Sequence, residues 1–238
     1  MLKNLEKSTY SKKNFEMNLL KDPIPSLIKK IALPASVGTF FQTMYNIVDT
    51  FYAGIISPEA LSALAKSFPI YFIIIAACIG VTVGGTSLIA NSIGEKNKEK
   101  ILSYFSHTII YGILLSLLVT FLGLNFSKEV FILMGSTDEV VSLGLKYTNV
   151  IFSGSIIFIL VVSLNALLHA DGDTKTYRNI LILSFFLNIV LNPIFIFGFF
   201  IIPAMGITGI GVSTILSQLI ALLILLMKIL KNSRLNDF

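Results

Sequence analysis

The sequence contains little charge and almost no cysteine. Charged residues make up 13% of its 238 residues and hydrophobic residues 55%, and the mean hydropathy is +0.84. A soluble globular domain carries roughly twice that share of charge. The single cysteine, Cys78, excludes a disulfide framework and a thiolate metal site. The composition therefore predicts an integral membrane protein.

Groupings of residues that are typical of enzymes are also missing. No apolar stretch contains a pair of carboxylates, no serine and histidine come with an acid in the pattern of a catalytic triad, and no Gly-rich loop ends in a phosphate-binding lysine. His169, Asp171 and Asp173 lie close together, but one histidine and two loop carboxylates fit a solvated turn before a helix better than a metal site. We expect no enzyme, no cofactor and no structural metal.

Uncharged stretches dominate the chain. The longest, residues 179–227, would form a helix of about 74 Å, against a hydrocarbon core of about 30 Å. Pro203 and the glycines that follow it should divide this stretch into two spans. We predict an all-α, polytopic membrane bundle whose six transmembrane helices cover residues 31–56, 61–93, 101–124, 140–168, 179–200 and 207–227.

The placement of the basic residues predicts the orientation. With six spans, both termini and the second and fourth loops share one side, and this side carries 15 of the 18 basic residues. The positive-inside rule makes it the cytoplasmic side. We expect a transmembrane lobe over residues 23–230 in the cell membrane, between cytoplasmic segments 1–22 and 231–238. The basic residues then report orientation, and we expect membrane lipid but no nucleic acid as a partner.

Asp49 is the one acid in the first span. Placing a carboxylate at membrane depth costs roughly 2.5 kcal/mol or more, so such residues usually face a protein-lined cavity and bind an ion, a proton or substrate. Asn46, Tyr45 and Gln42 share its helical face at spacings of three, four and seven. We expect these three to line a substrate cavity, together with Asn165 of the fourth predicted helix.

A second polar cluster lies in the fifth predicted helix. Asn188 and Asn192 are four residues apart and share a face. With Asp49 and a hydroxyl such as Thr214, they supply the oxygens that a hard cation such as Na⁺ requires. Alternatively, Asp49 takes up and releases a proton. In both cases Asp49 is the group that binds and releases the ion or proton. One acid with scattered amides fits a closed binding site better than the ring of charged side chains that lines a channel.

Two features predict local helix geometry. Pro34 removes the hydrogen bond to the carbonyl of Lys30, so we expect a kink near the cytoplasmic end of the first span. Gly80 and Gly84, four residues apart, predict a close helix–helix contact.

Several segments together resemble the amino-terminal half of the multidrug and toxic compound extrusion (MATE) transporters. They are residues 33–54 (LPASVGTFFQTMYNIVDTFYAG), 68–72 (FPIYF), 164–179 (LNALLHADGDTKTYRN), 188–198 (NIVLNPIFIFG) and 206–218 (GITGIGVSTILSQ). The resemblance implies an antiporter that exports cationic, amphipathic compounds in exchange for Na⁺ or H⁺. It also implies that Asp49, Asn188 and Thr214 belong to the cation site.

The chain departs from the family pattern in three ways. Asn192 stands where many members have aspartate, which favours proton coupling, and His169 stands where an arginine is common. The family has twelve helices in two similar halves, whereas six are predicted here. We expect the function to need the carboxyl-terminal half, or a parallel homodimer related by an axis along the membrane normal. A truncated product without transport activity is the alternative.

Two other functions remain open. A lipid-linked oligosaccharide flippase of the same superfamily would line its cavity with several Arg and Lys residues, but the spans contain only Lys66 and Lys146 at their margins. A non-transporting membrane assembly subunit would need no coupling site. Loss of cation-driven efflux in Asp49→Asn would distinguish an exporter from both.

Overall fold

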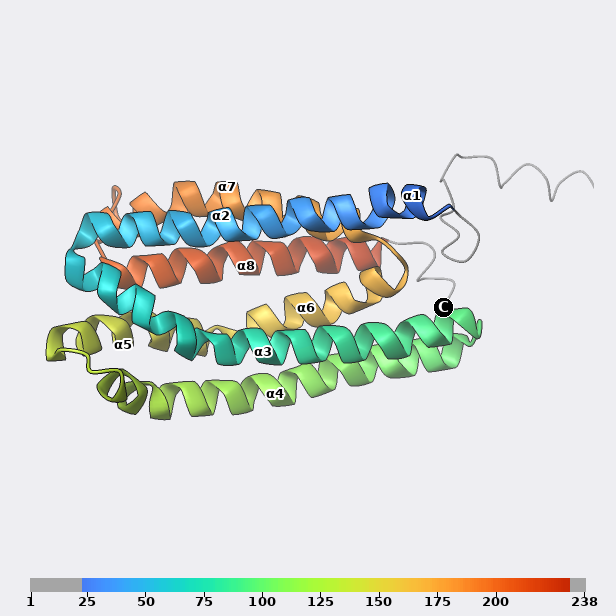
Figure 1. The fold of residues 1–238 in the computed structure, drawn as a ribbon, viewed down its shortest axis with the longest axis horizontal. Helices are drawn as coiled ribbons and strands as arrows, with labels where there is room; N and C mark the ends of the chain where they lie inside the picture. The colour runs from blue at the N-terminus through green and yellow to red at the C-terminus, as the bar shows by residue number, and fades with distance from the viewer. Residues whose placement is uncertain (1–22, 232–238) are drawn as a thin grey trace, which may run out of the picture.

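The computed structural model describes residues 23–231, which form a bundle of helices joined by short turns (Figure 1). A short helix, α1, leads into a π-helical turn, η1. The elements are α1 (Ile24–Leu27), η1 (Ile28–Ala32), α2 (Leu33–Ile56), α3 (Pro58–Gly94), α4 (Lys98–Leu133), α5 (Asp138–Ser153), α6 (Ser155–Ala170), α7 (Thr174–Phe197) and α8 (Ile207–Leu230). Within the described range, the only β-type pairing is the isolated bridge between Phe199 and Ile202.

The predicted fold class is confirmed, because the described chain is an all-α bundle with helices that can cross a membrane. By length and hydropathy four helices qualify, α3, α4, α7 and α8, and the bent pair α5–α6 counts as a fifth if taken as one span. The helix that carries Asp49, α2, has 24 residues and is not among them. Its polar side chains lower its hydropathy, as expected for a helix that lines a polar site.

The helix ends follow from local capping. Ser57 accepts a hydrogen bond from the amide of Ala60 at the start of α3, and Asn97 and Asp173 cap α4 and α7 in the same way. Helix α4 continues to Leu133, beyond the predicted end at residue 124. Gly135 lies two residues beyond this end, and its φ of +64° is typical of glycine after a helix terminus.

The fourth predicted helix is divided in the structure. The sequence predicts one helix over residues 140–168, whereas α5 and α6 meet at Gly154 with a bend of 43°. A Cβ atom at Gly154 would collide with the side chain of Ile215 in α8. The glycine therefore lets α8 lie close against the bend.

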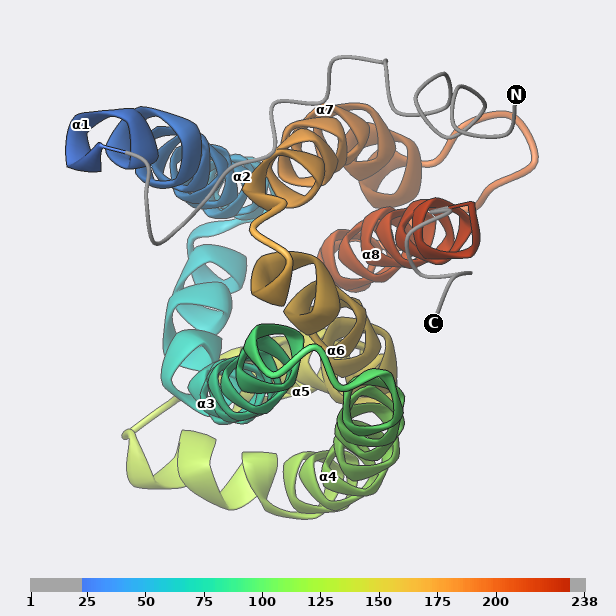
Figure 2. The same cartoon turned by 90° about the vertical axis from the view of Figure 1, so that its right-hand side faces the viewer.

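Two groups of helices face each other in the bundle. Helices α2, α7 and α8 lie together, α3, α4 and α5 lie opposite, and α6 runs between the groups (Figures 1 and 2). Helix α6 contacts α3, α4 and α8. The turns α3–α4 and α6–α7 lie at one end of the bundle, and the turns α2–α3, α4–α5 and α7–α8 lie at the other (Figure 1).

The structure tests one of the two local predictions. The kink at Pro34 stays a prediction, although the π-turn η1 does precede α2. The predicted contact at Gly80 and Gly84 is wrong for the described residues, because nothing lies within 4 Å of a Cβ atom at either position. The adjacent Gly85 makes the contact instead, and its Cβ would lie 2.6 Å from Thr108 of α4.

Candidate functional site

The carboxylate of Asp49 is buried and accepts hydrogen bonds from two other helices. Only 5% of Asp49 is exposed. The Nδ2 atoms of Asn188 and Asn192 in α7 donate to its Oδ1 over 2.9 and 2.8 Å. The hydroxyl of Thr214 in α8 donates to Oδ2 over 3.2 Å. The structure thus brings together the four residues that the sequence assigns to the cation or proton site.

A chain of hydrogen bonds holds these donors in place. Asn192 Nδ2 also lies 3.1 Å from Asn188 Oδ1, as the spacing of four residues on one helix allows. Ser213 of α8 donates to Asn192 Oδ1. Asn188, Asn192 and Ser213 are all fully buried. The α7–α8 contact therefore orients both amides with their N–H groups toward Asp49.

This arrangement compensates the negative charge of the carboxylate. A hydrogen bond to a charged group contributes about 1.5–3 kcal/mol, and burying an ion costs several kcal/mol. Three such bonds are of the size needed to offset that cost. The amide oxygens of Asn188 and Asn192 each accept a hydrogen bond from another side chain, whereas their N–H groups point to the carboxylate.

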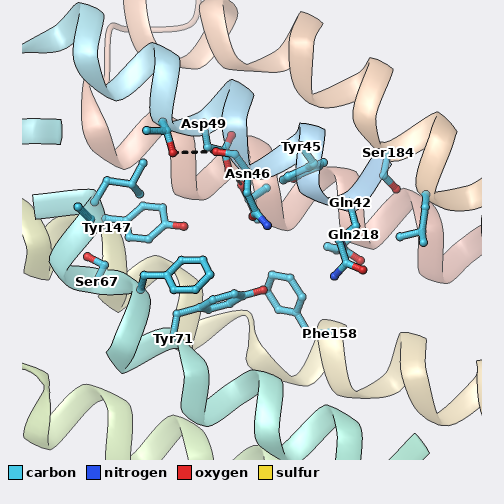
Figure 3. Close-up of a pocket in the computed structure, with 16 residues that line it drawn as sticks. Gln42, Tyr45, Asn46, Asp49, Ser67, Tyr71, Tyr147, Phe158, Ser184 and Gln218 are labelled. Atoms are coloured by element: carbon cyan, nitrogen blue, oxygen red, sulfur yellow. Dashed lines mark hydrogen bonds between the residues drawn. The ribbon is translucent and has the colours of Figure 1, made fainter. Parts of the chain in front are cut away.

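A cavity of about 380 Å³ lies beside Asp49, between the two groups of helices. In Figure 3, Asp49, Tyr45 and Asn46 on α2 lie across from Tyr71 and Phe158. Aromatic side chains from four helices contribute to the lining: Tyr45, Phe68, Tyr71, Tyr147 and Phe158. The other polar side chains of the lining come mainly from α2, α7 and α8, and Ser67 adds one from α3.

The predicted cavity residues do not all lie in the cavity. Gln42, Tyr45 and Asn46 line it, with Gln42 and Asn46 exposed and Tyr45 buried. Asn165 is not among the lining residues. It lies 1% exposed in α6, beside His169. Its assignment to this cavity is therefore corrected, because its side chain forms a hydrogen bond with His169, one turn later on α6.

Other lining residues were not singled out from the sequence. Tyr71, Tyr147 and Phe158 form an aromatic wall, and Gln218 closes one end. Aromatic residues are frequent throughout this chain, so no local spacing distinguishes these three. Gln218 carries a usable signal, because it follows Thr214 by four residues and so shares its helical face.

Metal-binding groups are scarce in the part of the chain that the structure covers. No three side chains of His, Cys, Asp or Glu come close enough to hold a metal ion between residues 23 and 231. The polar centre at Asp49 contains one carboxylate, amides and hydroxyls, which can bind a proton or a weakly held monovalent cation.

A bundle of apolar helices with one compensated carboxylate beside an aromatic-lined cavity defines the class of protein as a polytopic helical membrane protein. Comparison with known proteins gives the particular family: the MatE family model matches residues 34–194. The chain belongs to the MATE family. The predicted relationship is thereby confirmed, and members of this family are transporters, not enzymes.

Individual relatives agree with this assignment. The chain is 32% identical over 209 residues to the "Probable multidrug resistance protein NorM" of Thermotoga maritima, covering 87% of this chain and 45% of the relative. It is 28% identical over 204 residues to an "FAD transporter" of Shewanella oneidensis, covering 86% and 45%. A solved structure, "Crystal structure of MATE in the bent conformation", superposes with a TM-score of 0.82 at 31% identity, covering 94% and 49%. The chain thus spans about half the length of these relatives.

Proposed function

We propose that this chain forms the ion-coupling lobe of an antiporter that exports cationic, amphipathic compounds, with the binding and release of a proton at Asp49 as the coupling step. The observation that carries this proposal is a buried carboxylate with three side-chain donors from two other helices, next to a cavity of about 380 Å³. The multidrug names of relatives support the direction of transport.

The aromatic wall supports the proposed substrate class. A cation positioned over the face of a tyrosine or phenylalanine ring is stabilised by about 0.5–2 kcal/mol. Tyr71, Tyr147 and Phe158 offer such faces across the cavity from Asp49. A cationic amphiphile would place its charge near the carboxylate and its apolar body against the rings. Protonation of Asp49 would remove that attraction and favour release.

Proton coupling fits the hydrogen bonds at Asp49 better than Na⁺ coupling does. Na⁺ requires several oxygen ligands, but the two asparagines present their N–H groups to the carboxylate. Binding Na⁺ would require both amides to rotate and to give up their present partners. A proton needs no such rearrangement, because it adds to a carboxylate oxygen directly.

The decisive test is Asp49→Asn. Efflux of ethidium driven by a pH gradient should be abolished, while the amount of protein in the membrane stays unchanged. Asp138→Asn is the matched control, because Asp138 lies exposed in the first turn of α5. Full efflux by Asp49→Asn would remove Asp49 from the mechanism. A Na⁺ gradient that drives efflux where a pH gradient does not would establish Na⁺ coupling instead.

The flippase alternative predicts basic side chains in the cavity. None of the residues that line the cavity is Lys or Arg. Lys66 instead donates to Met134 O and Ser136 Oγ in the α4–α5 turn, over 3.2 and 3.1 Å. A pyrophosphate group would have no basic side chain to bind in this cavity. This favours the exporter over the flippase. It does not distinguish a transporter from an assembly subunit, and the efflux assay makes that distinction.

We also propose that the bundle end with the α3–α4 and α6–α7 turns faces the cytoplasm. Those turns and the helix ends beside them carry the basic residues Lys96, Lys98, Lys100, Lys175 and Arg178, as the positive-inside rule requires of the cytoplasmic side. Both termini would lie on that side of the cell membrane.

A further inference from the structure

Asn165 and His169 form a polar cluster at the α6–α7 end of the bundle, apart from the Asp49 site. Asn165 Nδ2 lies 3.1 Å from His169 Nε2. The ring of His169 meets the ring of Tyr177 in α7 edge to face, with centroids 5.8 Å apart. Asn165 is 1% exposed, and no described residue donates a hydrogen bond to its Oδ1. Leaving a buried acceptor unpaired is costly, so the cluster has a position for one more donor.

A protonated His169 supplies that donor. In the present arrangement Nε2 accepts from Asn165 Nδ2, which places the ring proton of neutral His169 on Nδ1. When Nε2 gains a proton it becomes a donor, and a half-turn of the Asn165 amide presents Oδ1 to it. The same pair of side chains thus forms one hydrogen bond in either protonation state of His169.

A second cavity lies next to the cavity at Asp49. It has a volume of about 260 Å³, and Tyr177 and Thr82 are among its lining residues. Five of its lining residues also line the cavity at Asp49, namely Gln42, Tyr71, Phe158, Leu181 and Gln218. The two cavities therefore share a wall, and the ring of Tyr177, which lines the second one, contacts the ring of His169. Gln42 and Gln218 lie together at the shared end (Figure 3).

Buried hydroxyls beside the cavity at Asp49 can bind water. The hydroxyls of Tyr45 and Ser217 are buried and lie near each other, with Thr214 and Asn188 close by. Tyr45 lines the cavity at Asp49, and Ser217 precedes Gln218 in α8. Water occupies about 30 Å³ in the liquid and binds buried polar atoms of this kind. The second cavity has room for several water molecules.

Few titratable groups surround His169. The charged group that acts on it is Asp173, which caps α7, and Tyr177 is the titratable group on α7. Asp171 lies exposed in the turn between them. From the other helices, Tyr104 of α4 packs near Leu167 and Ala170 at the end of α6, together with the apolar side chains Ile89, Ala90, Ile93, Ile101, Phe105 and Ile229. Among these groups, His169 is the one that forms a hydrogen bond with the buried Asn165.

We infer that His169, held by Asn165, is a second proton-binding site, which passes protons between Asp49 and the cytoplasm through the second cavity. This inference rests on the proposed coupling at Asp49. In one cycle the proton leaves an Asp49 oxygen for cavity water, reaches His169 Nε2, and is then released to water at the α6–α7 turn. Asp49 and His169 each return to their starting protonation state.

The test measures exchange of ethidium for protons, with the chain in its native membrane assembly reconstituted into liposomes. His169→Gln keeps a polar side chain that cannot titrate here, and we expect it to slow exchange about tenfold or more, in line with other positioned proton carriers. Ethidium binding at equilibrium should be unchanged, since His169 does not line the cavity. His107→Gln is the matched control, because His107 is exposed on α4 and bonds Ser103 O.

Chemical rescue separates a proton carrier from a packing residue. Adding imidazole should restore exchange in His169→Ala, whereas it should do nothing for Asp49→Asn. If His169→Ala does not accumulate in the membrane, the exchange rate of His169→Gln is measured against the pH on the cytoplasmic side. A flatter dependence on pH than in the wild type would support His169 as a proton carrier. Wild-type rates and pH profile in His169→Gln would overturn the second site. If Asp49→Asn abolishes exchange at the same time, the proposed function stands without it.

Discussion

At the scale of single residues, the orientation of donors around Asp49 governs the chemistry. Its Oδ1 accepts from two asparagines and its Oδ2 from Thr214 alone. Removing one donor to Oδ1 leaves another in place. Removing the hydroxyl of Thr214 leaves Oδ2 without a side-chain donor, so the two oxygens should respond differently to mutation.

Thr214→Val tests this difference, because it replaces the hydroxyl by a methyl group of similar size. Loss of one hydrogen bond to a charged group corresponds to about 1.5–3 kcal/mol, or roughly a 10- to 100-fold change in the equilibrium between charged and neutral Asp49. We expect the charged form to be disfavoured, so the pH optimum of ethidium efflux should move upward.

Thr208→Val on the same helix is the control for that experiment. Thr208 lies in the first turn of α8, outside the cavity lining. An unchanged pH optimum in Thr214→Val would mean that this hydroxyl does not influence the protonation of Asp49.

At the scale of elements, the α7–α8 contact positions the donors. Asn188 and Asn192 lie on α7, whereas Ser213 and Thr214 lie on α8. The two helices approach closely at Gly209, where a Cβ atom would lie 2.5 Å from the carbonyl oxygen of Phe195. Because the obstruction is backbone, it cannot move aside as a side chain can.

Gly209→Ala should therefore separate α7 from α8 and weaken both folding and transport. Overpacking typically costs about 1–3 kcal/mol, which exceeds the gain in helix propensity of about 1 kcal/mol for this substitution. Thermal unfolding in detergent measures the effect on stability. Gly80→Ala is the control, since its Cβ would meet nothing within 4 Å and only the propensity gain should remain. Equal melting temperatures for the two variants would contradict a backbone contact at Gly209.

At the scale of the whole molecule, one side of the bundle differs from the lipid-facing surface. Helix α4 exposes large apolar side chains, among them Leu114, Leu117 and Phe121. Helix α2 exposes Gln42, Thr43 and Asn46 within its span. Exposed amides at membrane depth are costly in lipid. We propose that this face of α2 meets a second lobe across a water-filled cavity, supplied by a carboxyl-terminal half or by a parallel second copy.

Crosslinking in native membranes tests this arrangement. With Cys78 replaced by serine, Thr43→Cys should crosslink to the second lobe, because Thr43 is exposed on α2 and follows the cavity-lining Gln42 directly. Leu117→Cys, 58% exposed on α4, should remain uncrosslinked at native expression. A species of twice the chain's mass would identify a homodimer. Crosslinking at Leu117 but not at Thr43 would place the interface on α4 and would contradict the proposed interface on α2.

The sequence by itself determined the class of protein and singled out the residues that meet at Asp49. Scarce charge and long apolar stretches allow no other environment than a membrane, and an acid inside such a stretch must be compensated. The i, i+4 spacing on one helix is sufficient to make Asn188 and Asn192 neighbours, because residues four apart lie one above the other on a helical face.

Only the tertiary structure decided which residues from different helices meet. The direction of Asn165 toward His169, the aromatic wall of Tyr71 and Phe158, and the break at Gly154 depend on how α6 packs against α3 and α8. Apolar helix faces are interchangeable in composition, so periodicity does not specify which face packs against which helix. That choice is made by close-packing over the whole bundle.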